Sequence, residues 1–418
     1  MPPAIASFPM SPATALTARE IALRRSNSVL FAVAIAAAGT RGIIEAVLDR
    51  SVAYVVQLFF ICGPLLWIEY RSRRVDPGRR WLPLRGPAAD FGWVIFLSVV
   101  SMFVTPVIHD AVGFQYILVL VFTWLLLAFA VQQLRRPTLD FAICFWSSTL
   151  IACLLAVVGI LQQVLIFPFE LPGYTNLFDV IRPPSLTASY LHYPLVIAIA
   201  ACNCYVAALN GRRLALLPMV FLVAATFGSF SRSGMLILFA AFGLSMFTDR
   251  RQFVRSVVVL GVTLALLFVL STMIDSSTIS LVDRLTSSVD TQSDGNDTRS
   301  AIWTNAIDKL SWLNVGIGTY FGLITNSASE ELRDLYGIVE SSPMQQILNI
   351  GLVGTVMFYG CFYRLARRFP KTDRYSQFVL AAAAVQSAFY QSIEVIPFLV
   401  MIMATAVFAA TSQHETTR

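Results

Sequence analysis

Residues 214–247 read LALLPMVFLVAATFGSFSRSGMLILFAAFGLSMF, and the run is almost continuously apolar. Arg232, between Ser231 and Ser233, interrupts it near the middle. The run is longer than the roughly 20 residues that one helix needs to cross a bilayer. It therefore predicts two membrane-spanning helices joined by a tight turn. Two roles for the guanidinium group remain possible. Arg232 is either an ordinary residue of the turn or a charged group that takes part in a reaction.

Comparable apolar runs recur along the whole chain of 418 residues, which is 57% hydrophobic and 13% charged. Ordinary soluble domains carry roughly 25% charged residues, so this composition indicates a polytopic membrane protein. We predict an all-α fold, a membrane helical bundle of about 12 transmembrane helices. The predicted spans are 27–48, 52–70, 90–107, 113–134, 139–166, 187–209, 214–230, 233–248, 254–274, 343–364, 376–391 and 394–411.

Basic residues concentrate in every second connection between these spans. By the positive-inside rule such connections stay in the cytoplasm, and the amino-terminal tail is expected on the same side. This orientation also accounts for the net charge of +6, so no nucleic-acid partner is needed. The basic connections are 71–87, 133–137, 210–213, 249–255 and 364–374.

This topology divides the chain into five parts. Residues 1–26 are rich in Pro, Ala and Ser and are expected to form a disordered cytoplasmic tail. Residues 27–274 contain transmembrane helices one to nine, and residues 343–411 contain helices ten to twelve. Between them, residues 275–342 form a long outer loop with amphipathic helices, indicated by the helical spacing of apolar residues after position 300. Residues 412–418 form a second cytoplasmic tail.

The positions of the cysteine and histidine residues indicate neither disulfide bonds nor a metal site. All six cysteines fall inside apolar runs, where they behave as small hydrophobic residues. The three histidines are too scattered to suggest a zinc site. We expect neither a metal site nor a cofactor.

Few basic residues remain on the outer side, and three of them are candidates for binding a ligand. A guanidinium group offers a planar fork of donors that matches phosphate oxygens in pairs. Arg182 and Arg232 lie in outer connections, and Arg299 falls in the first turn of a predicted amphipathic helix. The alternatives are an interfacial anchor for Arg232, a loop ion pair for Arg182 and a solvated position for Arg299. Arg41 and Glu45 are spaced as an internal i,i+4 ion pair.

Glu340 directly precedes the tenth predicted span, with Ser341 beside it. A carboxylate at this place can receive a proton from an attacking hydroxyl, or it can simply interact with the helix dipole. His192, at the start of the sixth span, is a rival base, and a structural role is its alternative. Ser231 and Ser233 are candidates for ligand binding, but each is also able to cap the helix that follows.

Four stretches together resemble the O-antigen ligase and polysaccharide polymerase (Wzy-like) family of bacterial membrane proteins. The resemblance covers roughly residues 180 to 360. The stretches are RPPSLTASYLHYPL from Arg182, SFSRSGML around Arg232, RSAIWTNAIDKLSWLNVGIGTYF from Arg299 to Phe321, and ESSPMQQILNIGLVG from Glu340. The ligase branch usually has His then Asn ahead of the last of these, so the ESS start looks more like the polymerases of exopolysaccharide or capsule pathways.

The resemblance implies metal-independent glycosyl transfer at the periplasmic face of the bacterial inner membrane. The donor would be a polyprenyl-diphosphate-linked oligosaccharide, whose diphosphate is held by Arg182 and Arg232, with Arg299 as a third contact. Glu340 would act as the catalytic carboxylate, and Ser231, Ser233, His192 and Ser341 would contact substrate. The resemblance also implies partners: membrane lipids, a chain-length regulator and a flippase.

Three functions remain open from the sequence. The first is a polymerase of lipid-linked repeat units for exopolysaccharide, capsule or O-antigen. The second is an O-antigen ligase that moves a finished glycan onto lipid A core or protein. The third is a transporter of lipid-linked sugars. Many transporters have internal repeats, and this sequence shows none. Asp110 and Glu394 lie near the predicted outer ends of spans, so a proton relay through the membrane is not evident.

Overall fold

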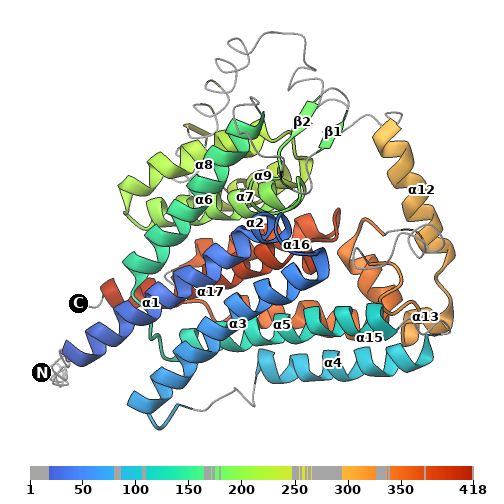
Figure 1. The fold of residues 1–418 in the computed structure, drawn as a ribbon, viewed down its shortest axis with the longest axis horizontal. Helices are drawn as coiled ribbons and strands as arrows, with labels where there is room; N and C mark the ends of the chain where they lie inside the picture. The colour runs from blue at the N-terminus through green and yellow to red at the C-terminus, as the bar shows by residue number, and fades with distance from the viewer. Residues whose placement is uncertain are drawn as a thin grey trace, which may run out of the picture.

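The computed structural model describes residues 18–79, 86–105, 110–163, 171, 175–177, 180–246, 254, 257–258, 261, 265, 294–325, 337, 339–370 and 373–416. These residues form a helical bundle with one short β-ribbon (Figure 1). The ribbon pairs β1 (Thr175–Leu177) with β2 (Val180–Arg182) in antiparallel fashion. The all-α bundle predicted from composition is thus confirmed as the main architecture.

The helices follow the apolar runs of the sequence. They are α1 (Ala18–Gly39), α2 (Arg41–Glu45), α3 (Arg50–Val75), α4 (Pro87–Val104), α5 (Asp110–Arg135), α6 (Phe141–Gln163), α7 (His192–Leu209), α8 (Leu216–Gly228), α9 (Arg232–Met246), α12 (Asp294–Asp308), α13 (Trp312–Gly316), α15 (Ser342–Ala366), α16 (Arg374–Ser387) and α17 (Ile396–Thr416). Two 3-10 turns, η1 (Arg213–Ala215) and η2 (Ser392–Glu394), precede α8 and α17.

Seven of the described helices are long and apolar enough to cross a membrane, and three shorter apolar helices accompany them at 213–228, 232–246 and 396–412. A helix lies at each predicted span except the ninth, 254–274, most of which falls outside the described residues. The predicted number of 12 is therefore not confirmed. The chain is a multi-pass membrane protein by the length and composition of its helices.

The first predicted span differs most from the structure. Helix α1 begins at Ala18, inside the predicted tail, because the segment AREIALRR consists mainly of good helix formers. The helix ends at Gly39, and the chain restarts as the short helix α2 at Arg41. The predicted i,i+4 ion pair is confirmed: the Arg41 Nε donates to Glu45 Oε1 at 2.7 Å. Residues 1–17 lie outside the described part of the chain.

A break divides α15 at Gly351, whose φ of 74° and ψ of 171° lie outside the helical region. The break frees carbonyl groups of the preceding turn, and the segment after α13 uses them. The backbone N–H groups of Thr319 and Tyr320 donate to the Leu348 carbonyl at 3.0 and 3.1 Å. Gly322 N donates to Asn349 Oδ1 at 3.0 Å. Residues 342–350 thus form a half-helix that is anchored to segment 316–325.

Three of the connections predicted to be cytoplasmic, 71–87, 133–137 and 364–374, lie at one end of the bundle. Arg79 pairs with Glu69 of α3 at 2.7 Å and also donates to the Arg136 carbonyl. At the same end, Arg364 of α15 pairs with Asp90 of α4. Figure 1 shows the start of α1 and the end of α17 towards its left edge, while α12 and α13 lie at the opposite edge.

Helix α7 lies at the centre of the bundle and is buried almost along its whole length. It packs against α6, α8, α9, α16 and α17. Its many alanines allow neighbouring backbones to approach closely, as in other membrane helix interfaces. This central helix fixes the position of its own first residue, His192, at the end where the outer connections gather.

Candidate functional site

The loop that follows Arg182 is held tightly against α6. Ser185 N–H donates to Gln162 Oε1 at 2.8 Å, and the Ser185 hydroxyl donates to the Leu155 carbonyl at 2.6 Å. Ser185 and Ala188 take positive φ angles of 51° and 63°, which non-glycine residues adopt only at a cost. Because the packing enforces this conformation, the loop has a fixed shape at the end of the bundle that was predicted to face outward.

Helix α2 closes the same loop from the other side. Gly42 N–H donates to the Leu186 carbonyl at 2.7 Å. A Cβ atom at Gly42 would lie 2.9 Å from that oxygen, so the close approach requires glycine. The ion pair of Arg41 with Glu45 is therefore carried next to the loop, and the charges of Arg41 and Arg50 act on His192.

Arg182 ends β2, and its guanidinium group lies over the ring of Tyr190, 5.8 Å from the ring centre. Its Nε atom is buried without a hydrogen-bond partner among the described residues. Burial, followed by the negative charge of Glu340, raises the pKa of the Tyr190 phenol above its ordinary value of 10.0. Tyr190 thus joins the predicted diphosphate-binding arginine with the predicted catalytic carboxylate.

Arg232 is the first residue of α9, which is placed beside the start of α7. A Cβ atom at Gly234 would lie 3.1 Å from the Pro194 carbonyl oxygen, so the first turns of α9 and α7 are in contact. Ser231 Oγ accepts a hydrogen bond from Gly234 N–H at 3.4 Å. Ser231 therefore acts as a helix cap, while Ser233 is half-buried in the first turn.

His192 begins α7 and stays a candidate base. Its ring hydrogen-bonds to the backbone of Thr187, and its Nδ1 atom has no hydrogen-bond partner within the described part of the chain. A neutral imidazole accepts a proton at the ring nitrogen that carries none, so His192 can serve as a base. The helix starts of α7 and α9 both direct backbone N–H groups to this end, which favours an anionic ligand.

Glu340 is half-buried immediately before α15, which begins as predicted with a proline in its first turn. Ser341 is the N-cap residue, is buried and makes no side-chain cap hydrogen bond. The Ser342 hydroxyl donates to the Tyr390 carbonyl at 2.8 Å. This bond ties the start of α15 to the segment between α16 and α17, which thereby joins the site.

Arg299 lies in α12, as the helical spacing predicted, but its side chain is outside the described residues. Position 299 is one turn before Trp303, whose ring stacks on Phe389 with centroids 6.5 Å apart. Ala306 of the same helix is buried with Ile324 and Val339. Helix α12 therefore packs beside the start of α15, at the outer end that carries the other candidates (Figure 1).

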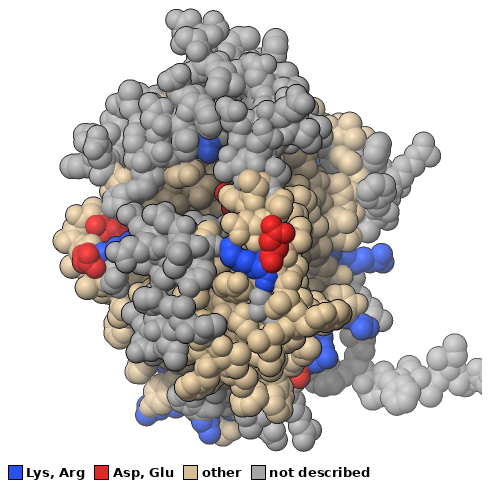
Figure 2. Space-filling view, turned by 90° about the vertical axis from the view of Figure 1, so that its right-hand side faces the viewer, with Lys and Arg blue, Asp and Glu red and all other residues tan. Residues whose placement is uncertain are grey.

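The structure thus brings Arg182, Glu340 and His192 to one end of the bundle, with Arg232 on an adjoining helix start. Figure 2 faces this end and shows a hollow in which acidic atoms are visible. Tyr190 is the site residue that sequence reasoning missed. Its position between two candidates, Arg182 and His192, was the available signal.

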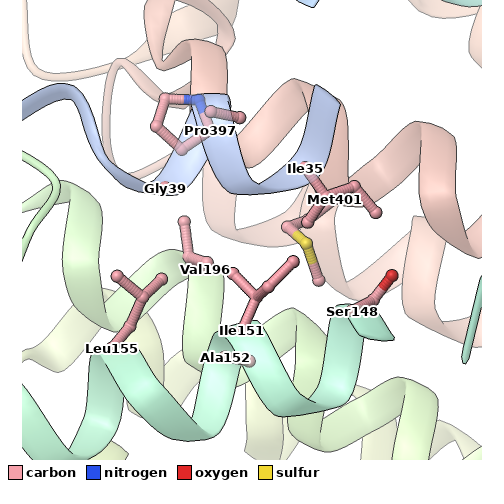
Figure 3. Close-up of a pocket in the computed structure, with 10 residues that line it drawn as sticks. Ile35, Gly39, Ser148, Ile151, Ala152, Leu155, Val196, Pro397 and Met401 are labelled. Atoms are coloured by element: carbon pink, nitrogen blue, oxygen red, sulfur yellow. The ribbon is translucent and has the colours of Figure 1, made fainter. Parts of the chain in front are cut away.

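A separate pocket lies deeper in the bundle and does not belong to this site. It is lined by apolar side chains of α1, α6, α7 and α17, including Ile35, Ile151, Val196 and Met401 (Figure 3). Its free volume of about 10 Å³ holds roughly one water molecule, far too little for a sugar. Among the described residues, no group of three His, Cys, Asp or Glu is placed to hold a metal ion.

Comparison with known families tests the resemblance seen in the sequence. No curated protein matches the chain. Residues 217–359 match the family model described as O-antigen ligase. The match includes Arg232, Arg299 and Glu340 but begins after Arg182 and His192. This match is consistent with the resemblance of the chain to the O-antigen ligase and Wzy-like family.

Proposed function

We propose that this protein is a polymerase of polyprenyl-diphosphate-linked oligosaccharide repeat units, acting at the periplasmic face of the bacterial inner membrane. It would serve the synthesis of exopolysaccharide, capsule or O-antigen. The O-antigen ligase domain supports the reaction class, because members of this family are glycosyltransferase-like enzymes that act on lipid-linked glycans. The observation that carries the proposal is the arrangement of Arg182, Tyr190 and Glu340, which puts an anion-binding group and a carboxylate on one side of the molecule.

In this proposal Arg182 and Arg232 bind the donor diphosphate. A guanidinium group stays protonated and binds phosphate oxygens in pairs, and the adjoining helix starts of α7 and α9 add oriented N–H donors. Such preorganised cations stabilise the charge that grows on a departing diphosphate. The buried Nε of Arg182 gains the partner that it lacks among the described residues when the diphosphate binds. Arg299 is a third contact from α12.

Glu340 activates the acceptor. The hydroxyl oxygen of the acceptor sugar attacks the anomeric carbon of the donor, and the bond from that carbon to the diphosphate oxygen breaks. The bonding electron pair leaves with the diphosphate, and the hydroxyl proton goes to Glu340. Tyr190 is a neutral phenol at neutral pH, and its ring supports the Arg182 guanidinium group that lies over it. His192 and Ser341 contact the bound sugars.

Ligation of a finished glycan onto lipid A core or protein is the second candidate, because the matching family model carries the description O-antigen ligase. Both reactions use the same donor half of the site, and only the acceptor differs. In either case we expect a flippase to supply the lipid-linked donor, and a chain-length regulator is a partner for polymerisation only.

Incubation of the purified protein in nanodiscs with a lipid-linked repeat unit separates the candidates. A ladder of products indicates a polymerase, a single transfer to an added acceptor indicates a ligase, and no reaction indicates a transporter. A Glu340→Gln variant provides the control for catalysis, since it keeps size but removes the base. Parental ladder formation by folded Glu340→Gln protein would limit Glu340 to a helix-cap role and make His192 the next base to test.

A further inference from the structure

A second carboxylate lies beside the proposed site. Glu394 ends η2, with one residue between it and the start of α17, and it is half-exposed. Its Oε1 atom accepts a hydrogen bond from the Nε2 of Gln345. Gln345 is fully buried in the first turn of α15, only a few residues after Glu340. One short helix segment thus holds Glu394 in place and also carries the predicted catalytic carboxylate.

Further hydrogen bonds fix the two acidic segments relative to each other. The Ser342 hydroxyl donates to the Tyr390 carbonyl and accepts from Ile393 N–H at 3.5 Å. The Gln391 Nε2 donates to the Val339 carbonyl, directly before Glu340. Because these contacts connect the residues on both sides of Glu340 with those just before Glu394, the two carboxylates belong to one rigid platform.

Electrostatic interactions place both carboxylates next to the same aromatic group. The charges of Glu340 and Glu394 both act on Tyr390, which is buried. The charge of Glu394 also acts on Tyr54 of α3 and Tyr116 of α5. The charge of Glu394 thus acts on phenol groups from three parts of the chain, and Gln345 donates an amide hydrogen bond to its carboxylate. Carboxylates, amides and aromatic rings are groups that bind the hydroxyl-rich and apolar faces of a ligand in a pocket.

The negative charge of Glu394 determines which part of the substrate it can bind. A diphosphate is repelled by carboxylates and binds on the arginine side of the site, at Arg182 and Arg232. Sugar hydroxyls, by contrast, donate strong charge-assisted hydrogen bonds to a carboxylate. We propose that Glu394, positioned by Gln345, binds hydroxyl groups of the acceptor oligosaccharide and presents its attacking hydroxyl to Glu340. The choice of an oligosaccharide as the ligand rests on the proposed function.

The test uses the full chain in nanodiscs and two probes. The first is the water-soluble oligosaccharide released by mild acid from the lipid-linked repeat unit, and the second is polyprenyl diphosphate without sugar. We expect Glu394→Gln to weaken oligosaccharide binding and to raise the acceptor KM by about 10- to 100-fold, the range for losing one hydrogen bond to a charged group. Its binding of polyprenyl diphosphate stays close to parental, because the diphosphate is held on the arginine side of the proposed site.

Two further variants separate binding from structure. Gln345→Met removes the positioning hydrogen bond and raises the acceptor KM in the same direction, whereas Glu394→Asp keeps the charge and retains part of the affinity. Asp90→Asn is the matched control, because it removes a carboxylate from the opposite end, where Asp90 pairs with Arg364. Parental oligosaccharide affinity in Glu394→Gln that still binds polyprenyl diphosphate overturns the inference. A parental protein that forms no ladder refutes the polymerase instead, and oligosaccharide binding then still decides the role of Glu394.

Discussion

Replacing Gly351 by alanine tests how the break in α15 shapes the site. The backbone at Gly351 takes φ 74° and ψ 171°, a region that is essentially restricted to glycine. A Cβ atom there would lie 2.7 Å from the carbonyl carbon of Gly316, below any normal contact. The variant must therefore straighten the helix or push away the segment 316–325, whose backbone hydrogen bonds to Leu348 depend on the break.

The expected loss of folding stability in Gly351→Ala comes from backbone strain and from the lost hydrogen bonds. Forcing an alanine into this backbone region costs about 1–3 kcal/mol. Loss of the two backbone hydrogen bonds to the Leu348 carbonyl adds about 1 kcal/mol each. At about 2–4 °C per kcal/mol for a large domain, the unfolding temperature falls by at least about 6 °C. Chain extension falls as well, because the half-helix 342–350 holds Gln345 and begins next to Glu340.

Gly360→Ala is the matched control in the same helix. Nothing lies within 4 Å of a Cβ atom at Gly360, and its backbone is helical. Alanine is favoured over glycine there by roughly 0.5–1 kcal/mol, so this variant is neutral or slightly more stable. Thermal unfolding in one detergent, followed by tryptophan fluorescence, compares the two. Equal unfolding temperatures for Gly351→Ala and Gly360→Ala would refute the account of the break.

Three other predictions concern the two ends of the bundle. The Arg79 side chain is 1% exposed, so Arg79→Met leaves the Glu69 carboxylate buried without its partner and should destabilise the protein by about 3–5 kcal/mol. The Arg364 side chain is 62% exposed, so Arg364→Met should destabilise the protein by less than about 1 kcal/mol. Thermal unfolding measures both, and similar shifts would contradict the difference in burial. Arg182→Lys keeps the positive charge but loses the planar guanidinium group that binds two phosphate oxygens, so chain extension should slow about 10- to 100-fold. A parental rate would indicate that Arg182 has only a structural role. Because burial and the charge of Glu340 raise the pKa of Tyr190 above 10.0, the folded state resists ionisation of this phenol, and stability falls as the pH rises beyond 10.0. The parent should therefore lose stability relative to Tyr190→Phe between pH 8 and 11, and a constant difference between their unfolding curves would argue against the raised pKa.

Local patterning predicted most of the helices because each apolar run is long enough to cross a bilayer. The predicted span 139–166 corresponds to α6, Phe141–Gln163, and the predicted span 394–411 corresponds to α17, Ile396–Thr416. The break at Gly351 escaped prediction, because a glycine inside an apolar helix is ordinary. Its positive φ arises only from packing against Gly316, which lies in a different segment of the chain.

Local sequence patterns also predicted part of the candidate site. Arg182 and Arg232 were identified because basic residues are few on the predicted outer side, and Glu340 because it directly precedes an apolar run. Tyr190 and Glu394 were given no role, since their importance depends on contacts between distant segments. The hydrogen bond from Gln345 to Glu394 joins residues 49 positions apart, and no local spacing encodes it.

The release of polyprenyl diphosphate tests the central claim most directly. Purified protein in nanodiscs receives a repeat unit that is labelled in both the lipid and the glycan, and free lipid diphosphate and glycosidic linkages are counted over time. Transfer from a lipid diphosphate at the site of Arg182, Arg232 and Glu340 predicts one polyprenyl diphosphate for every linkage formed, with both processes slowed together in Arg232→Lys. Growth of the glycan without matching release of lipid diphosphate, or no growth at all by the folded protein, would contradict the account.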